Sequence, residues 1–211
     1  MKIGQTVRNQ NPQISGADLA GTYIAEELHL HWGSKSHFGA EHGINGYIHD
    51  AEMHIVHRRS IYSDIKTAAT KTDGLAVLAI MINFSDVPQT PEMLRLSQGL
   101  PEFFWQLSQI VKFQSSTYTR TSLTVGSILF FLKLDTFYTY HGSLTTPGCH
   151  EAVHWIVFPT AIILHPNPGH NIYSIKYENG KPLVNNNRKI TTYNPKVSVY
   201  DVNYWNYMYK P

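Results

Sequence analysis

The sequence of 211 residues contains little cysteine, little charge and no long hydrophobic stretch. The one cysteine, Cys149, excludes an intrachain disulfide and a cysteine-rich zinc site. Charged residues make up 15% of the chain and its net charge is +2, so neither a nucleic acid nor an anionic membrane is indicated as a partner. Apolar segments such as 75–82 are shorter than the roughly 18 residues of a membrane-spanning helix. The first residues lack the apolar core of a signal peptide.

The length and a hydrophobic content of 42% predict one globular domain with a sizeable core. Residues 91–111 carry apolar side chains at helical spacing and predict an amphipathic helix on the surface of a sheet. Asn83 begins an Asn-Phe-Ser glycosylation sequon directly after an apolar segment, so a used site and a chance match both remain open.

What the sequence has in excess is histidine, with twelve in all and seven of them between residues 29 and 57. A polar surface without a role is the ordinary explanation of such a cluster. The spacing favours another one. If residues 25–32 form a strand, Glu27, His29 and His31 lie on one face, and the apolar residues between them lie on the other.

A second segment, 51–57, repeats this arrangement with Glu52 and His54 two residues apart. If the two segments pair as antiparallel strands, His54 comes to lie opposite His29 and His31. Three neutral imidazoles that leave a fourth position open for water are the ligand set of a catalytic zinc site. The two nearby glutamates are candidates to accept the other imidazole N–H groups.

Five segments, taken in order along the chain, resemble motifs of the α-class carbonic anhydrases: 27–33, 39–42, 51–57, 73–78 and 138–157. The resemblance implies a mostly β fold with peripheral helices, in which a twisted, largely antiparallel central sheet forms a single domain. It assigns residues 1–189 to this domain, which we expect to be incomplete at its N-terminal end because family members have further residues there. Residues 190–211 form a tyrosine-rich tail that has no recognised counterpart and could add a strand, mediate association or do neither.

The resemblance also implies a site. Zn²⁺ would be bound by His29, His31 and His54. Thr145 would accept a hydrogen bond from a zinc-bound hydroxide and donate its own proton to Glu41. The expected polar supports of the ligands are Glu27, Glu52, His42 and Tyr140. The expected pocket for CO2 is lined by Val56, Val77, Leu144, Val153, Trp155 and Thr146.

Two positions depart from the common family pattern. Gln5 falls where the family often has a proton-shuttling histidine, and an amide has no proton that titrates near neutral pH. Glu27 stands where many relatives carry glutamine, which adds a negative charge near the metal.

The implied reaction is the reversible hydration of CO2 to bicarbonate and a proton, with sulfonamides or anions as inhibitors. A related binding or structural protein and a fragment with little activity are the alternatives. The three histidines, Glu41 and Thr145 are all present and favour the enzyme. Cys149 resembles a cysteine of the extracellular members that pairs with one near their N-terminus. This implies an extracellular or secreted intact protein, with a cytoplasmic one as the alternative. The oligomeric state stays open.

Overall fold

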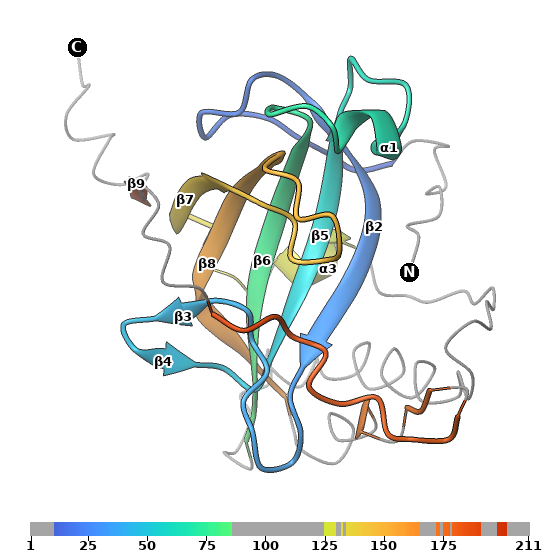
Figure 1. The fold of residues 1–211 in the computed structure, drawn as a ribbon. Coiled ribbons are helices and arrows are strands. Elements are labelled where there is room, and N and C mark those ends of the chain that lie inside the picture. Colours follow the sequence, from blue (N-terminus) through green and yellow to red (C-terminus); the bar gives the residue numbers. More distant parts are fainter. Residues whose placement is uncertain are drawn as a thin grey trace.

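A computed structural model describes residues 11–85, 125–129, 132, 134–164, 172–173, 175–177, 179–190 and 198–201. Its main feature is a twisted seven-stranded sheet with the strand order β1-β2-β5-β6-β8-β7-β9 (Figure 1). These strands are β1 (Gln13–Ile14), β2 (Tyr23–Trp32), β5 (Ala51–Arg59), β6 (Leu75–Phe84), β7 (Thr136–Gly142), β8 (Val153–Leu164) and β9 (Ser198–Asp201). The strands β3 (Gly43–Ile44) and β4 (Tyr47–Ile48) form a separate hairpin.

Neighbouring strands of the sheet run antiparallel except for β6 and β8, which are parallel. The predicted mostly β fold on a largely antiparallel sheet is therefore confirmed. The parallel pair lies at the centre, where β6 is an almost unbroken apolar run and is buried on both faces. Such burial is typical of strands with cover on both sides.

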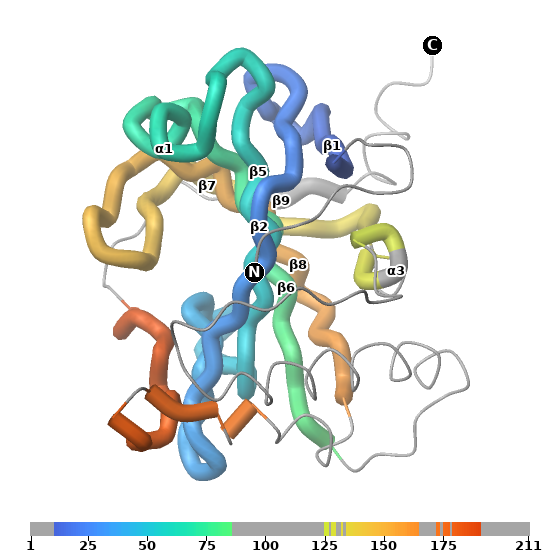
Figure 2. Tube along the Cα trace, turned by 90° about the vertical axis from the view of Figure 1, so that its right-hand side faces the viewer, coloured from blue at the N-terminus to red at the C-terminus, as the bar shows by residue number. Residues whose placement is uncertain are grey.

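The two faces of the sheet pack into separate hydrophobic clusters, because successive side chains of a strand point to opposite faces. In β5, Met53 and Ile55 belong to the cluster on the back face, while Val56 belongs to the cluster on the front face. His54 alternates with them and shares the front face. Figure 2 shows α1 (Ile65–Ala68) on one side of the sheet and α3 (Val125–Leu129) on the other.

Helix α1 begins at Asp64, whose carboxylate accepts a hydrogen bond of 2.8 Å from the backbone N–H of Thr67. This bond and those from the Thr67 and Ser63 hydroxyls lower the pKa of Asp64 to about 2. A capping carboxylate of this kind satisfies an N–H group that would otherwise lack a partner in the first turn. The cap fixes the short helix beside the front face, where Ala68 is buried.

The structure bears on several of the predictions made from the sequence. Residues 198–201 of the tail add a strand to β7, which was one of the three alternatives for that segment. Asn83 lies within β6, and its Oδ1 atom is 3.0 Å from Nδ1 of His49, which favours a chance match of the sequon. The predicted helix at 91–111 lies outside the described residues, as does Gln5. In the described part of the chain, no helix has the length and apolar character needed to cross a membrane.

Candidate metal centre

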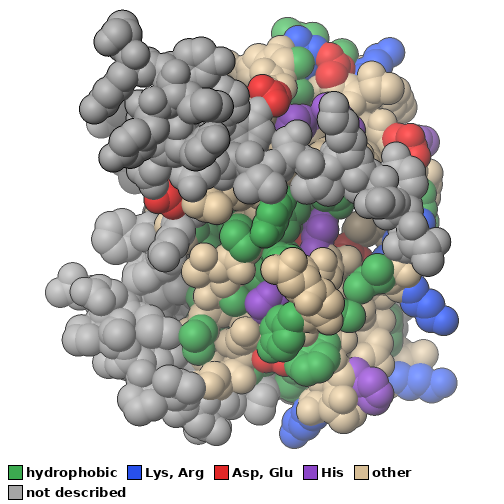
Figure 3. Space-filling view, turned by 90° about the vertical axis from the view of Figure 1, so that its left-hand side faces the viewer, with side chains coloured by type: hydrophobic (Ala, Val, Ile, Leu, Met, Phe, Trp, Pro, Cys, Tyr) green, Lys and Arg blue, Asp and Glu red, His purple; other side chains and the backbone are tan. Residues whose placement is uncertain are grey.

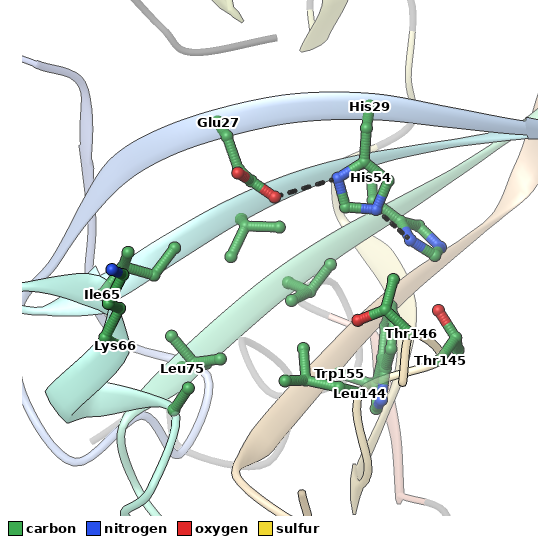
Figure 4. A pocket seen from close by; sticks show the side chains of 13 residues that line it. Glu27, His29, His54, Ile65, Lys66, Leu75, Leu144, Thr145, Thr146 and Trp155 are labelled. Carbon is green, nitrogen blue, oxygen red and sulfur yellow. Dashed lines mark hydrogen bonds and ion pairs between the residues drawn. The ribbon is translucent and has the colours of Figure 1, made fainter. Parts of the chain in front are cut away.

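Three histidines meet on the front face because of the register between β2 and β5. His29 is the direct antiparallel partner of His54, and His31 follows His29 on the same face. The rings lie edge to face or tilted, with centroids 4.7–5.2 Å apart. Nε2 of His29 and Nδ1 of His54 are 3.3 Å apart, and Figure 4 shows both rings at one end of the pocket.

The outward nitrogen of each ring has an oxygen partner. Nδ1 of His29 is 3.2 Å from Oε1 of Glu27, and Nε2 of His54 is 2.6 Å from Oε1 of Glu52. Nδ1 of His31 donates to the backbone carbonyl of Asn186 at 3.1 Å. These contacts fix the ring directions and leave lone pairs on the inward nitrogens. Metal-binding histidines usually donate their other ring N–H to an oxygen in this way.

Two of the inward nitrogens have the separation of ligands on a tetrahedral zinc ion, and all three ligand atoms lie within 4.8 Å of one another. Two ligands at about 2.05 Å from such an ion are themselves about 3.3 Å apart, which is the separation found between His29 and His54. The buried Nε2 of His31 has no hydrogen-bond partner among the described residues. A buried polar atom without a partner costs roughly 1–3 kcal/mol, so a metal ligand role explains its position.

Burial keeps the His31 and His54 imidazoles neutral. It lowers the pKa of His54 to about 4 despite the neighbouring Glu52 carboxylate, and it also lowers the pKa of His31. A neutral ring at physiological pH has the lone pair that a metal needs. The pKa of Glu52 is held well below its usual value, because His42 and His54 outweigh the effect of burial.

A buried polar network supports the ligands from behind. Oε2 of Glu52 accepts the backbone N–H groups of Glu41 and His42, each at 2.8 Å. Its Oε1 atom is 2.6 Å from Nδ1 of His42, whose Nε2 lies 2.7 Å from the hydroxyl of Tyr140. Burial raises the pKa of Tyr140, so this hydroxyl stays protonated. One carboxylate thus joins β5, the loop before β3, and β7.

A cavity of about 220 Å³ opens beside His29 and His54. Figure 3 shows histidine side chains beside hydrophobic ones in a hollow of the surface. Of the residues predicted for the pocket, the cavity is lined by Val56, Val77, Leu144, Thr146 and Trp155. Val153 is buried in the cluster behind it and is not among the described lining residues. The mouth is formed by Ile65, Lys66 and Ala69 of α1 and its end.

The structure does not join Thr145 and Glu41 by a hydrogen bond among the described contacts. Oε1 of Glu41 accepts the backbone N–H of Arg188 at 2.7 Å and lies 3.3 Å from Nδ1 of His31. Its buried Oε2 atom has no partner in the described part of the chain. Thr145 lines the cavity instead, on the loop after β7.

Sequence reasoning missed the segment that carries Asn186 and Arg188, to which it gave no role. The segment is tied to the end of β2 by the bond from Asn186 N–H to the Trp32 carbonyl, 3.2 Å long. The Asn186 side chain also accepts the Trp32 N–H at 2.7 Å. Spacing along the sequence could not predict the contact between this segment and the end of β2. The partners are more than 150 residues apart, and the group that accepts the His31 N–H is a backbone carbonyl.

Three histidines on neighbouring strands, each with an oxygen partner on its outward nitrogen, form a group that could hold a metal ion, an arrangement typical of catalytic zinc sites. The profile of the eukaryotic-type carbonic anhydrases matches residues 2–201, and the chain belongs to this family. Carbonic anhydrase 6 of Homo sapiens is 39% identical over 158 residues, which are 73% of this chain and 48% of that protein. Carbonic anhydrase 4 of Rattus norvegicus is 36% identical over 166 residues, or 78% of this chain and 49% of the relative. The chain spans about half the length of these curated relatives.

Proposed function

We propose that this chain catalyses the reversible hydration of CO2 to bicarbonate and a proton, with Zn²⁺ held by His29, His31 and His54. The observation that carries the proposal is the convergence of three inward nitrogens whose outward partners are all engaged. When bound, zinc supplies a Lewis acid that lets water ionise near neutral pH, an effect best known from carbonic anhydrases themselves.

The cavity suits a small, linear, uncharged substrate. Val56, Val77 and Trp155 present an apolar wall next to His29 and His54, and such a wall excludes the water that would compete with CO2. The indole N–H of Trp155 donates to the Ser143 carbonyl at 3.2 Å, which holds the ring in this wall.

Thr145 and Glu41 have the proposed orienting role. In this proposal the Thr145 hydroxyl donates a hydrogen bond to Glu41 and accepts one from the attacking oxygen, so that the lone pair of that oxygen points to carbon. The buried Oε2 of Glu41 is the acceptor with capacity for this bond. In this account the bond forms in the working complex, since catalytic hydrogen bonds often shorten only there.

The test is the purified full chain loaded with zinc. We expect one zinc per chain and CO2 hydration that a sulfonamide inhibits, both lost in His54→Gln and both kept in His37→Ala, a matched exposed histidine. Hydration should also rise with the concentration of an imidazole buffer, because Gln5 offers no titrating proton. A folded chain with one zinc and no hydration would support the binding-protein alternative. A chain with no zinc and no cooperative melt would support the fragment alternative.

Two further proposals concern the surroundings of the enzyme. We expect bicarbonate-like anions and sulfonamides to bind in the same cavity, where Lys66 adds a positive charge at the mouth. The extracellular location rests on Cys149, which is exposed and free among the described residues.

A further inference from the structure

A second pair of histidines lies on the back face of the sheet, away from the candidate metal centre. His141 of β7 and His154 of β8 are direct antiparallel partners. His154 follows Val153 and precedes Trp155, which belong to the front cluster, so its own side chain points to the back. The mechanism proposed above uses neither residue.

The two rings repeat the geometry of the first centre. Nε2 of His141 and Nδ1 of His154 are 3.3 Å apart, which equals the separation of the corresponding atoms of His29 and His54. Their rings meet edge to face at 85°, compared with 80° in the front pair. Two nitrogens about 3.3 Å apart match two positions of a tetrahedral zinc ion and form only a long hydrogen bond with each other.

A neighbouring hydroxyl fixes the ring of His154. Oγ1 of the buried Thr139 lies 2.6 Å from Nε2 of His154, just as Oε1 of Glu52 lies 2.6 Å from Nε2 of His54. When Thr139 accepts the Nε2 proton, the lone pair of His154 is on Nδ1, the atom that faces His141. Outer partners of this kind orient metal-binding histidines.

A strained turn lies beside this pair. Gly16, Ala17 and Asp18 have φ angles of 89°, 51° and 61°, and the last two are costly for residues with a side chain. The backbone of Ala17 and the carboxylate of Asp18 favour the charged form of the His154 ring. Burial and His141 nevertheless lower the pKa of His154, which keeps the ring neutral.

We propose that His141 and His154 form a second metal site on the back of the sheet, selective for divalent ions that prefer imidazole, such as Cu²⁺ and Zn²⁺. Water supplies the remaining ligands. His141 is exposed and gives the ion a path from solvent, while His154 is 4% exposed and anchors it. An imidazole pair favours Cu²⁺ most strongly among the divalent ions.

The experiment titrates Cu²⁺ into the zinc-loaded full chain. Electron paramagnetic resonance reads the nitrogen ligands of bound copper, and zinc is measured in the same sample so that copper in the front centre is not counted. We expect one copper with two imidazole nitrogens while one zinc per chain is retained. Because the readout is binding, its outcome is independent of whether the chain hydrates CO2.

Three variants decide the assignment. His141→Ala should lose the copper and keep the zinc, and His37→Ala, a matched exposed histidine, should keep both. Thr139→Val should weaken copper binding by roughly tenfold, as expected for loss of an outer partner. The proposal is overturned if zinc-loaded protein binds no copper, if His141→Ala binds it as the unchanged chain does, or if the copper signal lacks two imidazole nitrogens.

Discussion

At the scale of single residues, the candidate site depends on which groups around the histidines are charged. Glu52 is fully buried and lies between two imidazoles, while Glu27 is partly open to solvent at the edge of the cavity. Both carboxylates contact an outward ring nitrogen, but water screens the charge of Glu27 well and the charge of Glu52 poorly. The two positions therefore have different effects on the chemistry.

Replacing Glu27 by glutamine should lower the midpoint of the pH–rate profile for CO2 hydration. Glutamine still accepts the Nδ1–H of His29 but removes a negative charge, which makes ionisation of water in the centre easier. The Glu27 side chain is 39% exposed, so screening limits the shift to a fraction of a pH unit. The measurement is the rate from pH 5.5 to 9, with the exposed Glu151→Gln as control. A midpoint that stays or rises would contradict the charge argument.

His57 should make the stability of the protein depend on pH without any role in the site. Burial lowers its pKa to about 4, and Nδ1 donates to the Ile55 carbonyl at 2.9 Å. The unfolded chain binds this proton near pH 6.5 and the native chain does not, so stability falls as the pH drops from about 6.5 to about 4. The difference in pKa corresponds to at most about 3 kcal/mol.

Urea unfolding at pH 7, 5.5 and 4.5 tests this expectation. His57→Gln should show a shallower loss of unfolding free energy over that range than the unchanged chain, because glutamine takes up no proton. His54 titrates in both proteins, so its contribution to the unfolding free energy cancels when the two are compared. Parallel curves for the two proteins would show that His57 does not carry the dependence, and His37→Gln serves as the exposed control.

At the scale of elements, the sequence was informative where a pattern is local. Period-two alternation predicted β2 and β5, and the antiparallel pairing of these strands places His54 opposite His29 as expected. The parallel pairing of β6 with β8 had no such signal, since both are apolar runs and 68 residues lie between them. The contact of Asn186 with His31 was likewise invisible, because a backbone carbonyl leaves no mark in the sequence.

The loop between β2 and β5 is fixed by a close crossing of its own backbone. A Cβ atom on Gly39 would lie 1.7 Å from the Gly33 nitrogen. The backbone around Gly39 can therefore contact the backbone around Gly33 only because Gly39 has no side chain. Just beyond Gly39 the loop carries Glu41 and His42, whose N–H groups bind Glu52. The crossing therefore positions the polar support of the centre.

Gly39→Ala should separate these backbone segments and disturb that support. We expect a loss of unfolding free energy of about 1–3 kcal/mol, as for an overpacked site, and weaker zinc binding. Thermal melting and a zinc competition assay measure the two effects. Ser36→Ala, an exposed position in the same loop, is the control. A variant with unchanged zinc affinity would show that the crossing does not position Glu52.

At the scale of the whole molecule, the centre connects parts of the chain that are distant in sequence. His29 and His31 belong to β2, and His54 belongs to β5. The carbonyl that accepts the His31 ring N–H belongs to the segment 179–190. Backbone N–H groups of this segment also donate hydrogen bonds to the end of β2 and to the Glu41 carboxylate. A ligand that fixes His31 therefore also favours the docked position of this segment.

Zinc should for this reason protect the segment around Asn186 from hydrogen exchange. Metal binding stabilises only conformations in which the three histidines are assembled, and the N–H groups of Asn185, Asn186 and Arg188 are bonded only while the segment is docked. Mass spectrometry of exchanged peptides should show slower exchange at 183–190 with zinc than without it. The parallel strands β6 and β8 should change much less, since their bonds lie in the core. Equal exchange with and without zinc, or the same protection by zinc in His54→Gln, would separate the segment from the metal centre. In that case the Asn186 carbonyl would hold the His31 ring without linking the stability of the two regions.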